Sequence, residues 1–248
     1  MSRSASVVIM YVMVKNNCGF EEALEFVKKS RPCVIPNEGF SQQLKLWGDI
    51  QFQFEGEAYD TYIKNVIEKA KEERFVDVTL TFLKLTYIPS SLLSVSSLVN
   101  LYLNDNLIHE IPDDIVKLVN LEYLNLESNK IRKIPRFLGK MQNLKRIFLG
   151  NNQIKKVPIE LYQLENLLEL SLKNNQIKKI TEEVAKLRSV NILDFSGNKL
   201  KAIPESVAKL ENLFMINLNF NCFTKVPSVL NVMNFANIRL DMKTQVKV

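Results

Sequence analysis

The sequence contains few cysteine and histidine residues, which are common catalytic and metal-binding side chains. The 248 residues include three cysteines, Cys18, Cys33 and Cys222, and a single histidine, His109. The cysteines show no paired spacing, so we expect no disulfide framework, no zinc site and no other cofactor. Unpaired thiols are typical of a reducing compartment, which favours a cytoplasmic protein. We expect the lone histidine, which falls in a loop, at the surface rather than as a catalytic base.

An apolar run near the N-terminus imitates a signal peptide. Val7–Val14 is almost wholly apolar and follows Arg3. The run is too short to cross a membrane, and no small-residue cleavage site follows Lys15. We therefore expect neither secretion nor a transmembrane segment.

A period of 23 residues organises the chain from about residue 75 onward. Proline recurs at this spacing, with one threonine: Pro89, Pro112, Pro135, Pro158, Thr181, Pro204 and Pro227. Asparagine recurs in the same phase after an initial leucine: Leu83, Asn106, Asn129, Asn152, Asn175, Asn198 and Asn221. A domain with a single core does not keep such a phase, so the sequence predicts a solenoid of seven turns.

Each turn has a frame such as Leu98–Asn106, with apolar residues at fixed positions and asparagine last. The alternating leucines predict a short strand with both leucines pointing into the stack. The buried asparagine is expected to bond backbone groups of its own and the next turn. Each proline suits the start of a helical turn on the convex side. Leu83 predicts an irregular first turn, and Ile238 and Leu240, one residue early, predict an irregular last one.

This frame is the leucine-rich repeat signature, and residues of about 75–240 resemble the repeats of intracellular proteins of the Ras-suppressor type. The resemblance implies an α/β fold, a right-handed leucine-rich-repeat solenoid. Such a fold usually binds proteins on its concave strand face.

The first fifty residues lack the period and predict helices, including Ala5–Val14 and Phe20–Lys29. Their apolar faces require a partner that the sequence does not supply. Residues of about 2–52 resemble the C-terminal half of a dual-specificity protein phosphatase. The matching segments are Ser2–Val8, Glu22-Ala23, Val27-Lys28, Arg31-Pro32, Pro36–Phe40 and Gln43-Leu44. Because the central sheet of that family is missing, we expect Ala5–Val14 to be poorly covered.

The phosphatase signature is His-Cys-x-x-Gly-x-Ser-Arg-Ser, and Ser2, Arg3 and Ser4 match its last three residues. The resemblance implies that Arg3 holds phosphoryl oxygens and that Ser4 assists the leaving cysteine thiolate. The cysteine nucleophile and the general-acid aspartate would lie upstream of Met1. We therefore expect a truncated domain without activity as written; a phosphate-binding remnant formed by Ser2, Arg3 and Ser4 is a weaker alternative.

Two surfaces of the predicted solenoid could bind partners. On the concave face, aromatic and arginine side chains of the kind found in binding hot spots gather on adjacent turns: Tyr102, Tyr123, Arg146 and Phe148. After each asparagine, cations line one edge: Arg132, Lys133, Lys155, Lys156, Lys178, Lys179 and Lys201. This edge could attract an acidic protein or an anionic membrane. It lacks the interleaved aromatics of a nucleic-acid surface. An ordinary solvated face is the strong alternative, because lysine is common in such loops and the convex side carries compensating acidic residues.

The sequence thus predicts a phosphatase fragment at 1–52, a charged helical linker at 53–74 and a repeat domain at 75–248. We expect a monomeric protein-interaction module that recruits a phosphoprotein or acidic protein. The alternative is a fragment of an active protein tyrosine, serine and threonine phosphatase whose repeats select the substrate. Upstream sequence containing His-Cys in frame with Met1 would separate the two.

Overall fold

The computed structural model describes residues 8–9, 11–13, 15–16, 18–30, 44–45, 48, 56–231 and 238–239. The chain divides into two compact units, Met1–Glu68 and Lys69–Val248. The predicted phosphate-binding remnant, Ser2, Arg3 and Ser4, lies outside the described residues.

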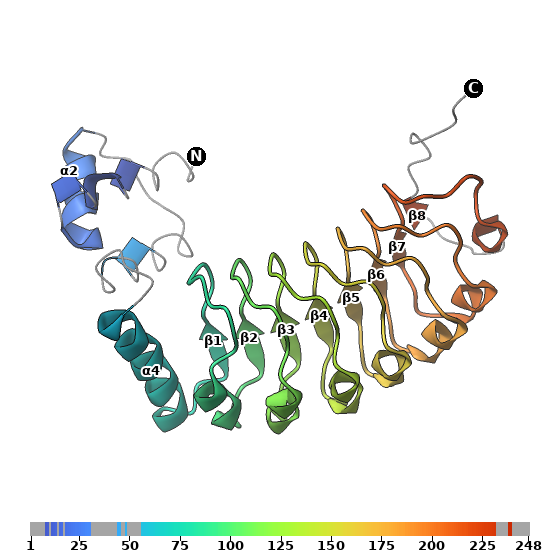
Figure 1. Ribbon diagram of the computed structural model, residues 1–248, viewed down its shortest axis with the longest axis horizontal. Helices are drawn as coiled ribbons and strands as arrows, with labels where there is room; N and C mark the ends of the chain where they lie inside the picture. Colours follow the sequence, from blue (N-terminus) through green and yellow to red (C-terminus); the bar gives the residue numbers. More distant parts are fainter. Residues whose placement is uncertain are drawn as a thin grey trace. The chain divides into compact units, whose positions relative to one another are not determined.

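The second unit is a solenoid with one short strand per turn (Figure 1). The strands are β1 (Asp77–Thr79), β2 (Asn100–Tyr102), β3 (Tyr123–Asn125), β4 (Arg146–Phe148), β5 (Glu169–Ser171), β6 (Ile192–Asp194), β7 (Met215–Asn217) and β8 (Ile238–Arg239). They form one eight-stranded parallel sheet in sequence order. Residues 23 apart pair from β1 to β7. Ile216 pairs with Ile238, so the last strand falls one residue early, as predicted.

The segments on the outer side of the arc are 3-10 helices (Figure 1). They are η1 (Ser90–Ser94), η2 (Asp113–Lys117), η3 (Arg136–Lys140), η4 (Ile159–Gln163), η5 (Glu182–Lys186), η6 (Glu205–Lys209) and η7 (Ser228–Asn231). In η2, the Ile115 amide donates to the Pro112 carbonyl over 3.1 Å, and the Leu118 amide donates to the Ile115 carbonyl over 3.0 Å. Only five residues lie between the proline and the following leucine, so tight bonds of this kind replace α-helical ones.

The asparagine column is a ladder inside the solenoid. Asn129 is representative: its Oδ1 accepts the Ile108 amide over 2.9 Å, and its Nδ2 donates to the carbonyls of Leu103 and Leu126 over 2.9 and 3.1 Å. The asparagine therefore joins its own turn to the preceding turn, and the predicted bond to the next turn was wrong. The same geometry accounts for Leu83, because in the described part of the chain no strand precedes β1 to supply a carbonyl. Instead, the Leu83 amide donates to Asn106 Oδ1 over 2.9 Å.

The first unit contains α2 (Phe20–Ser30) and most of α4 (Glu57–Glu72), and residues 8–9, 11–13 and 15–16 are also helical. Ile9, Val12 and Met13 are buried in a small core; its other buried members are Phe20, Ala23, Val27 and Leu44. The prediction that this first helix is poorly covered was wrong for that face. Val8 and Tyr11, on the other face, are exposed. Short helices can bury one face against each other without a sheet, which explains the partial coverage.

Candidate functional site

Three aromatic rings form a ladder across adjacent strands of the sheet. The Tyr102 and Tyr123 ring centroids lie 4.9 Å apart, and those of Tyr123 and Phe148 lie 5.2 Å apart. Tyr102 and Phe148 directly follow the buried central residue of their strands in the sequence. Tyr123 directly precedes the buried central residue of its strand, Leu124. The rings therefore meet diagonally, at distances favourable for aromatic pairs. All three side chains are half-buried, so part of each ring remains accessible to a partner.

Burial raises the pKa of the Tyr123 hydroxyl, with a further contribution from Tyr102. Tyr123 thus stays neutral at physiological pH and can donate a hydrogen bond. The ladder offers apolar ring area with a polar edge, a combination enriched at protein interfaces.

Arg146 extends the ladder as its charged neighbour, directly across from Tyr123 in the β3–β4 register. Its Nε lies 3.8 Å from Glu169 Oε2, and the arginine is more than half exposed. Burial raises the pKa of Glu169, while Arg146 lowers it. Glu169 therefore orients the guanidinium of Arg146, which remains accessible to a carboxylate of a partner.

The seven predicted edge cations lie on the segments that return from the strands to the 3-10 helices. The structure adds Lys130 and Lys199, which occupy the position directly after Asn129 and Asn198. Among the described residues, none of these nine side chains has an acidic group within ion-pairing distance. Thr181, the backbone of Glu183 and, less strongly, Lys186 and Lys179 lower the pKa of the Glu183 carboxyl group. Sequence reasoning could have found Lys130 and Lys199, because both occupy the same position of the 23-residue repeat.

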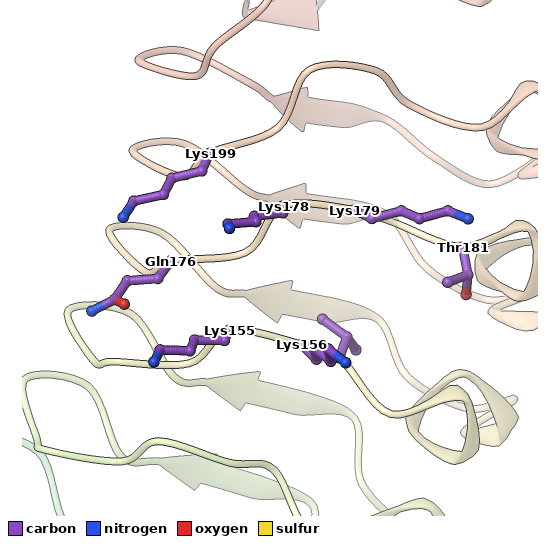
Figure 2. Close-up of a pocket in the computed structure, with 8 residues that line it drawn as sticks. Lys155, Lys156, Gln176, Lys178, Lys179, Thr181 and Lys199 are labelled. Carbon is purple, nitrogen blue, oxygen red and sulfur yellow. The ribbon is translucent and has the colours of Figure 1, made fainter.

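Part of this edge is hollowed (Figure 2). A depression of about 520 Å³ is lined by Lys155, Lys156, Val157, Gln176, Lys178, Lys179, Thr181 and Lys199. Lys155, Lys178 and Lys199 extend toward the loops that follow the strands, and Lys156 and Lys179 extend toward the 3-10 helices (Figure 2). These five lysines therefore form two files along the solenoid, on either side of the depression.

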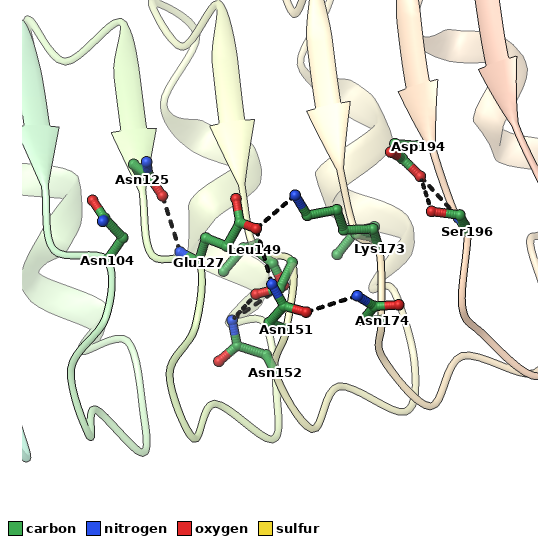
Figure 3. A network of polar contacts seen from close by, with 12 residues as sticks. Asn104, Asn125, Glu127, Leu149, Asn151, Asn152, Lys173, Asn174, Asp194 and Ser196 are labelled. Carbon is green, nitrogen blue, oxygen red and sulfur yellow. Dashed lines mark hydrogen bonds and ion pairs between the residues drawn. The ribbon is translucent and has the colours of Figure 1, made fainter. Parts of the chain in front are cut away.

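A polar network that the sequence did not reveal crosses the ends of the strands (Figure 3). Lys173 Nζ lies 2.7 Å from Glu127 Oε1, although the two residues are two turns apart. Between them stands Gly150, where an added Cβ would lie 2.8 Å from Lys173 Cγ. The missing side chain thus lets the lysine lie across the intervening turn. Asn151 Nδ2 donates to Glu127 Oε1 over 2.9 Å and completes the bridge.

The cysteines and histidine show no catalytic arrangement among the described residues. Cys18 is half-buried. Burial and, to a smaller extent, the charge of Glu22 raise the pKa of its thiol. A raised pKa opposes formation of a reactive thiolate. Cys222 and His109 are exposed, and Cys33 lies outside the described residues.

The part of the chain that the structure describes contains no group of three or more His, Cys, Asp or Glu side chains placed to hold a metal ion. It also contains no helix that is long and apolar enough to cross a membrane.

Comparison with known families assigns the repeats. Residues 96–154 and 165–223 match one leucine-rich-repeat family, and residues 142–186 match a second. The solenoid is a leucine-rich-repeat domain. Among solved structures it is similar to a plant peptide hormone receptor, RGFR1, in complex with RGF2. That match has a TM-score of 0.56 and 29% identity, and it covers 62% of this chain and 26% of the receptor chain.

The first segment matches a different family. Residues 1–50 match the catalytic domain of dual specificity phosphatases. The chain is 53% identical to dual specificity protein phosphatase 15 of Rattus norvegicus over 47 residues, which are 19% of this chain and 20% of the relative. It is 48% identical to MAP kinase phosphatase with leucine-rich repeats protein 2 of Dictyostelium discoideum over 44 residues, 18% of this chain and 6% of the relative. The chain thus spans a fifth or less of the length of these relatives. It joins part of a dual specificity phosphatase domain to leucine-rich repeats.

Proposed function

We propose that the chain is a protein-interaction module whose concave face binds a protein partner through Tyr102, Tyr123 and Phe148, with Arg146 selecting an acidic group. The observation that carries this proposal is the ladder of half-exposed rings, 4.9 and 5.2 Å apart. The rings restrain one another before binding, so they lose less conformational freedom when a partner packs on them. The similarity to a receptor solved with a bound peptide supports the choice of ligand class.

The test is to remove the central ring of the ladder. Affinity purification with the full chain and with Tyr123→Ala should yield proteins that are enriched by the first and lost by the second, at least about tenfold for a hot-spot residue. Met215→Ala is the matched control, because Met215 occupies the same column four strands away and is also half-buried. Equal loss with both variants, or no loss with Tyr123→Ala, would contradict binding at the ladder.

For the phosphatase-like segment, we propose that the 248-residue chain by itself hydrolyses no phosphate ester. None of Cys18, Cys33 and Cys222 precedes an arginine at the spacing of the phosphatase signature. By resemblance, Ser2, Arg3 and Ser4 are the phosphate-binding part of that signature. The alternative remains a longer active phosphatase in which these residues complete the active site and the repeats select the substrate.

Two measurements separate these alternatives. The purified chain should show no turnover of para-nitrophenyl phosphate above buffer; turnover that a cysteine-to-serine change abolishes would overturn this proposal. Mass spectrometry of the endogenous protein then tests the alternative, because peptides upstream of Met1 containing His-Cys would identify an enzyme.

The remaining assignments are also proposals. We assign residues 1–52 to the phosphatase-like segment, 53–74 to a linker and 75–248 to the repeat domain. The division between the two compact units falls inside this linker. We further propose a cytoplasmic monomer. Limited proteolysis within 53–74, light scattering and fluorescence imaging test these three assignments in turn.

A further inference from the structure

The basic edge differs from an ordinary solvated surface in how its charges are placed. The edge, defined as Lys130, Arg132, Lys133, Lys155, Lys156, Lys178, Lys179, Lys199 and Lys201, extends over four consecutive turns. Strand-to-strand spacing places successive turns about 5 Å apart on this part of the solenoid. Like charges at such a separation repel one another, and no described acidic side chain forms an ion pair with any of them. An anionic partner would relieve this repulsion.

The direction of the lysines restricts the shape of that partner. Lys155 and Lys178 extend to one side of the hollow, and Lys156 and Lys179 extend to the other (Figure 2). In an extended peptide, successive side chains also point to opposite sides. A peptide lying along the solenoid would therefore present alternate carboxylates to the two files. Side chains two residues apart in a strand are about 6.6 Å apart, which the long lysine side chains can reach.

Other anionic partners fit less well. A membrane surface requires cations that all extend toward one plane, whereas these diverge. The hollow is lined by lysines, Val157, Gln176 and Thr181, with no aromatic ring. Single-stranded nucleic acid is usually held by such rings, on which its bases stack.

We propose that the basic edge binds an extended acidic segment of a protein partner, laid along the hollow between the two files of lysines. This site is separate from the concave ladder and does not depend on the function proposed for it.

The experiment measures binding of a fluorescent oligoglutamate peptide of about ten residues, enough to cross four turns, to the full chain by anisotropy. The edge variant is Lys156→Gln/Lys178→Gln/Lys179→Gln, which removes three cations from the hollow. The matched control is Lys140→Gln/Lys186→Gln/Lys209→Gln, which removes three exposed lysines from the 3-10 helices. Both variants change the net charge equally, so they separate a local site from general attraction.

We expect the edge variant to weaken binding at least about fivefold and the control by less than about twofold, with a strong dependence on salt. Equal weakening by both variants, or undiminished binding to the edge variant, would overturn the proposal. So would edge-dependent binding of phosphatidylserine vesicles or oligothymidine in the absence of peptide binding. Tyr123→Ala should leave peptide binding unchanged. The experiments therefore distinguish failure of the proposed concave site from failure of the proposed edge site.

Discussion

The concave face and the basic edge of the same solenoid differ in whether their charged side chains form ion pairs. Beside the strands, three cations have an acidic neighbour: Lys145 lies 2.8 Å from Glu122, Arg146 3.8 Å from Glu169 and Lys173 2.7 Å from Glu127. On the edge, nine cations have no ion-pairing partner among the described residues. Pairing fixes side chains in place, whereas unpaired charge acts over distance. The concave face is thus suited to precise contact, and the edge to electrostatic attraction.

The stability of each turn is expected to be most sensitive to substitution of its buried asparagine. Asn152 Oδ1 accepts the Ile131 amide over 2.9 Å, and Nδ2 donates to three carbonyls. Asn152→Leu should lower the free energy of unfolding by about 3 kcal/mol or more, because these buried groups lose their partner. Urea denaturation measures the loss. The adjacent Asn151 is exposed, and Asn151→Gly, which keeps its positive φ of 52°, should cost less than about 1 kcal/mol. Similar losses would show that the buried ladder is no stronger than the surface contacts.

A second weak point is the residue with positive φ that lies three positions after each strand from β1 to β7. Gly197 has a φ of +64°, and an added Cβ would lie 2.0 Å from Asn174 Oδ1. Gly197→Ala should therefore destabilise the solenoid by about 1–2 kcal/mol, measured by thermal unfolding. Adding Asn174→Gly should recover the part due to the collision and leave the part due to φ. An unchanged melting temperature in Gly197→Ala would contradict this close approach.

Neutralising lysines should change stability in opposite directions on the two surfaces. At low ionic strength, Lys156→Gln/Lys178→Gln/Lys179→Gln should raise the melting temperature by up to about 2 °C, because repulsion along the edge falls. Lys173→Gln should lower it, because Glu127 loses its partner. High salt should reduce both effects. Shifts of the same sign in low salt would remove the contrast between the surfaces.

The smallest expected effect concerns pH. Burial raises the pKa of Glu169 in the folded protein above its ordinary value of 4.5. A group with a raised folded pKa contributes stability at low pH and loses it as pH rises through that pKa. Glu169→Gln should therefore gain in melting temperature relative to the natural sequence between pH 4 and pH 7, by about 1 °C, because the group is only partly buried. A difference that stays constant with pH would contradict the raised pKa.

Much of the solenoid was predictable because the sequence repeats with a constant period. The 23-residue period places Tyr123 opposite Arg146 on neighbouring strands, because the two residues are 23 apart, and the register confirms this. The direction of the asparagine bonds was not predictable, since a period does not specify which neighbouring turn a side chain reaches. The bridge from Lys173 to Glu127 was missed for a related reason, because it skips a turn and depends on the small size of Gly150.

The sequence by itself determined the periodic fold, its irregular ends and the positions of the aromatic and basic columns. These features follow from spacing along one dimension, in which each turn repeats the last. Only the tertiary structure decided which charges are paired, how the three rings contact one another, and that the edge lysines diverge around a hollow. Those properties depend on side-chain directions and on distances between turns, which no linear pattern contains.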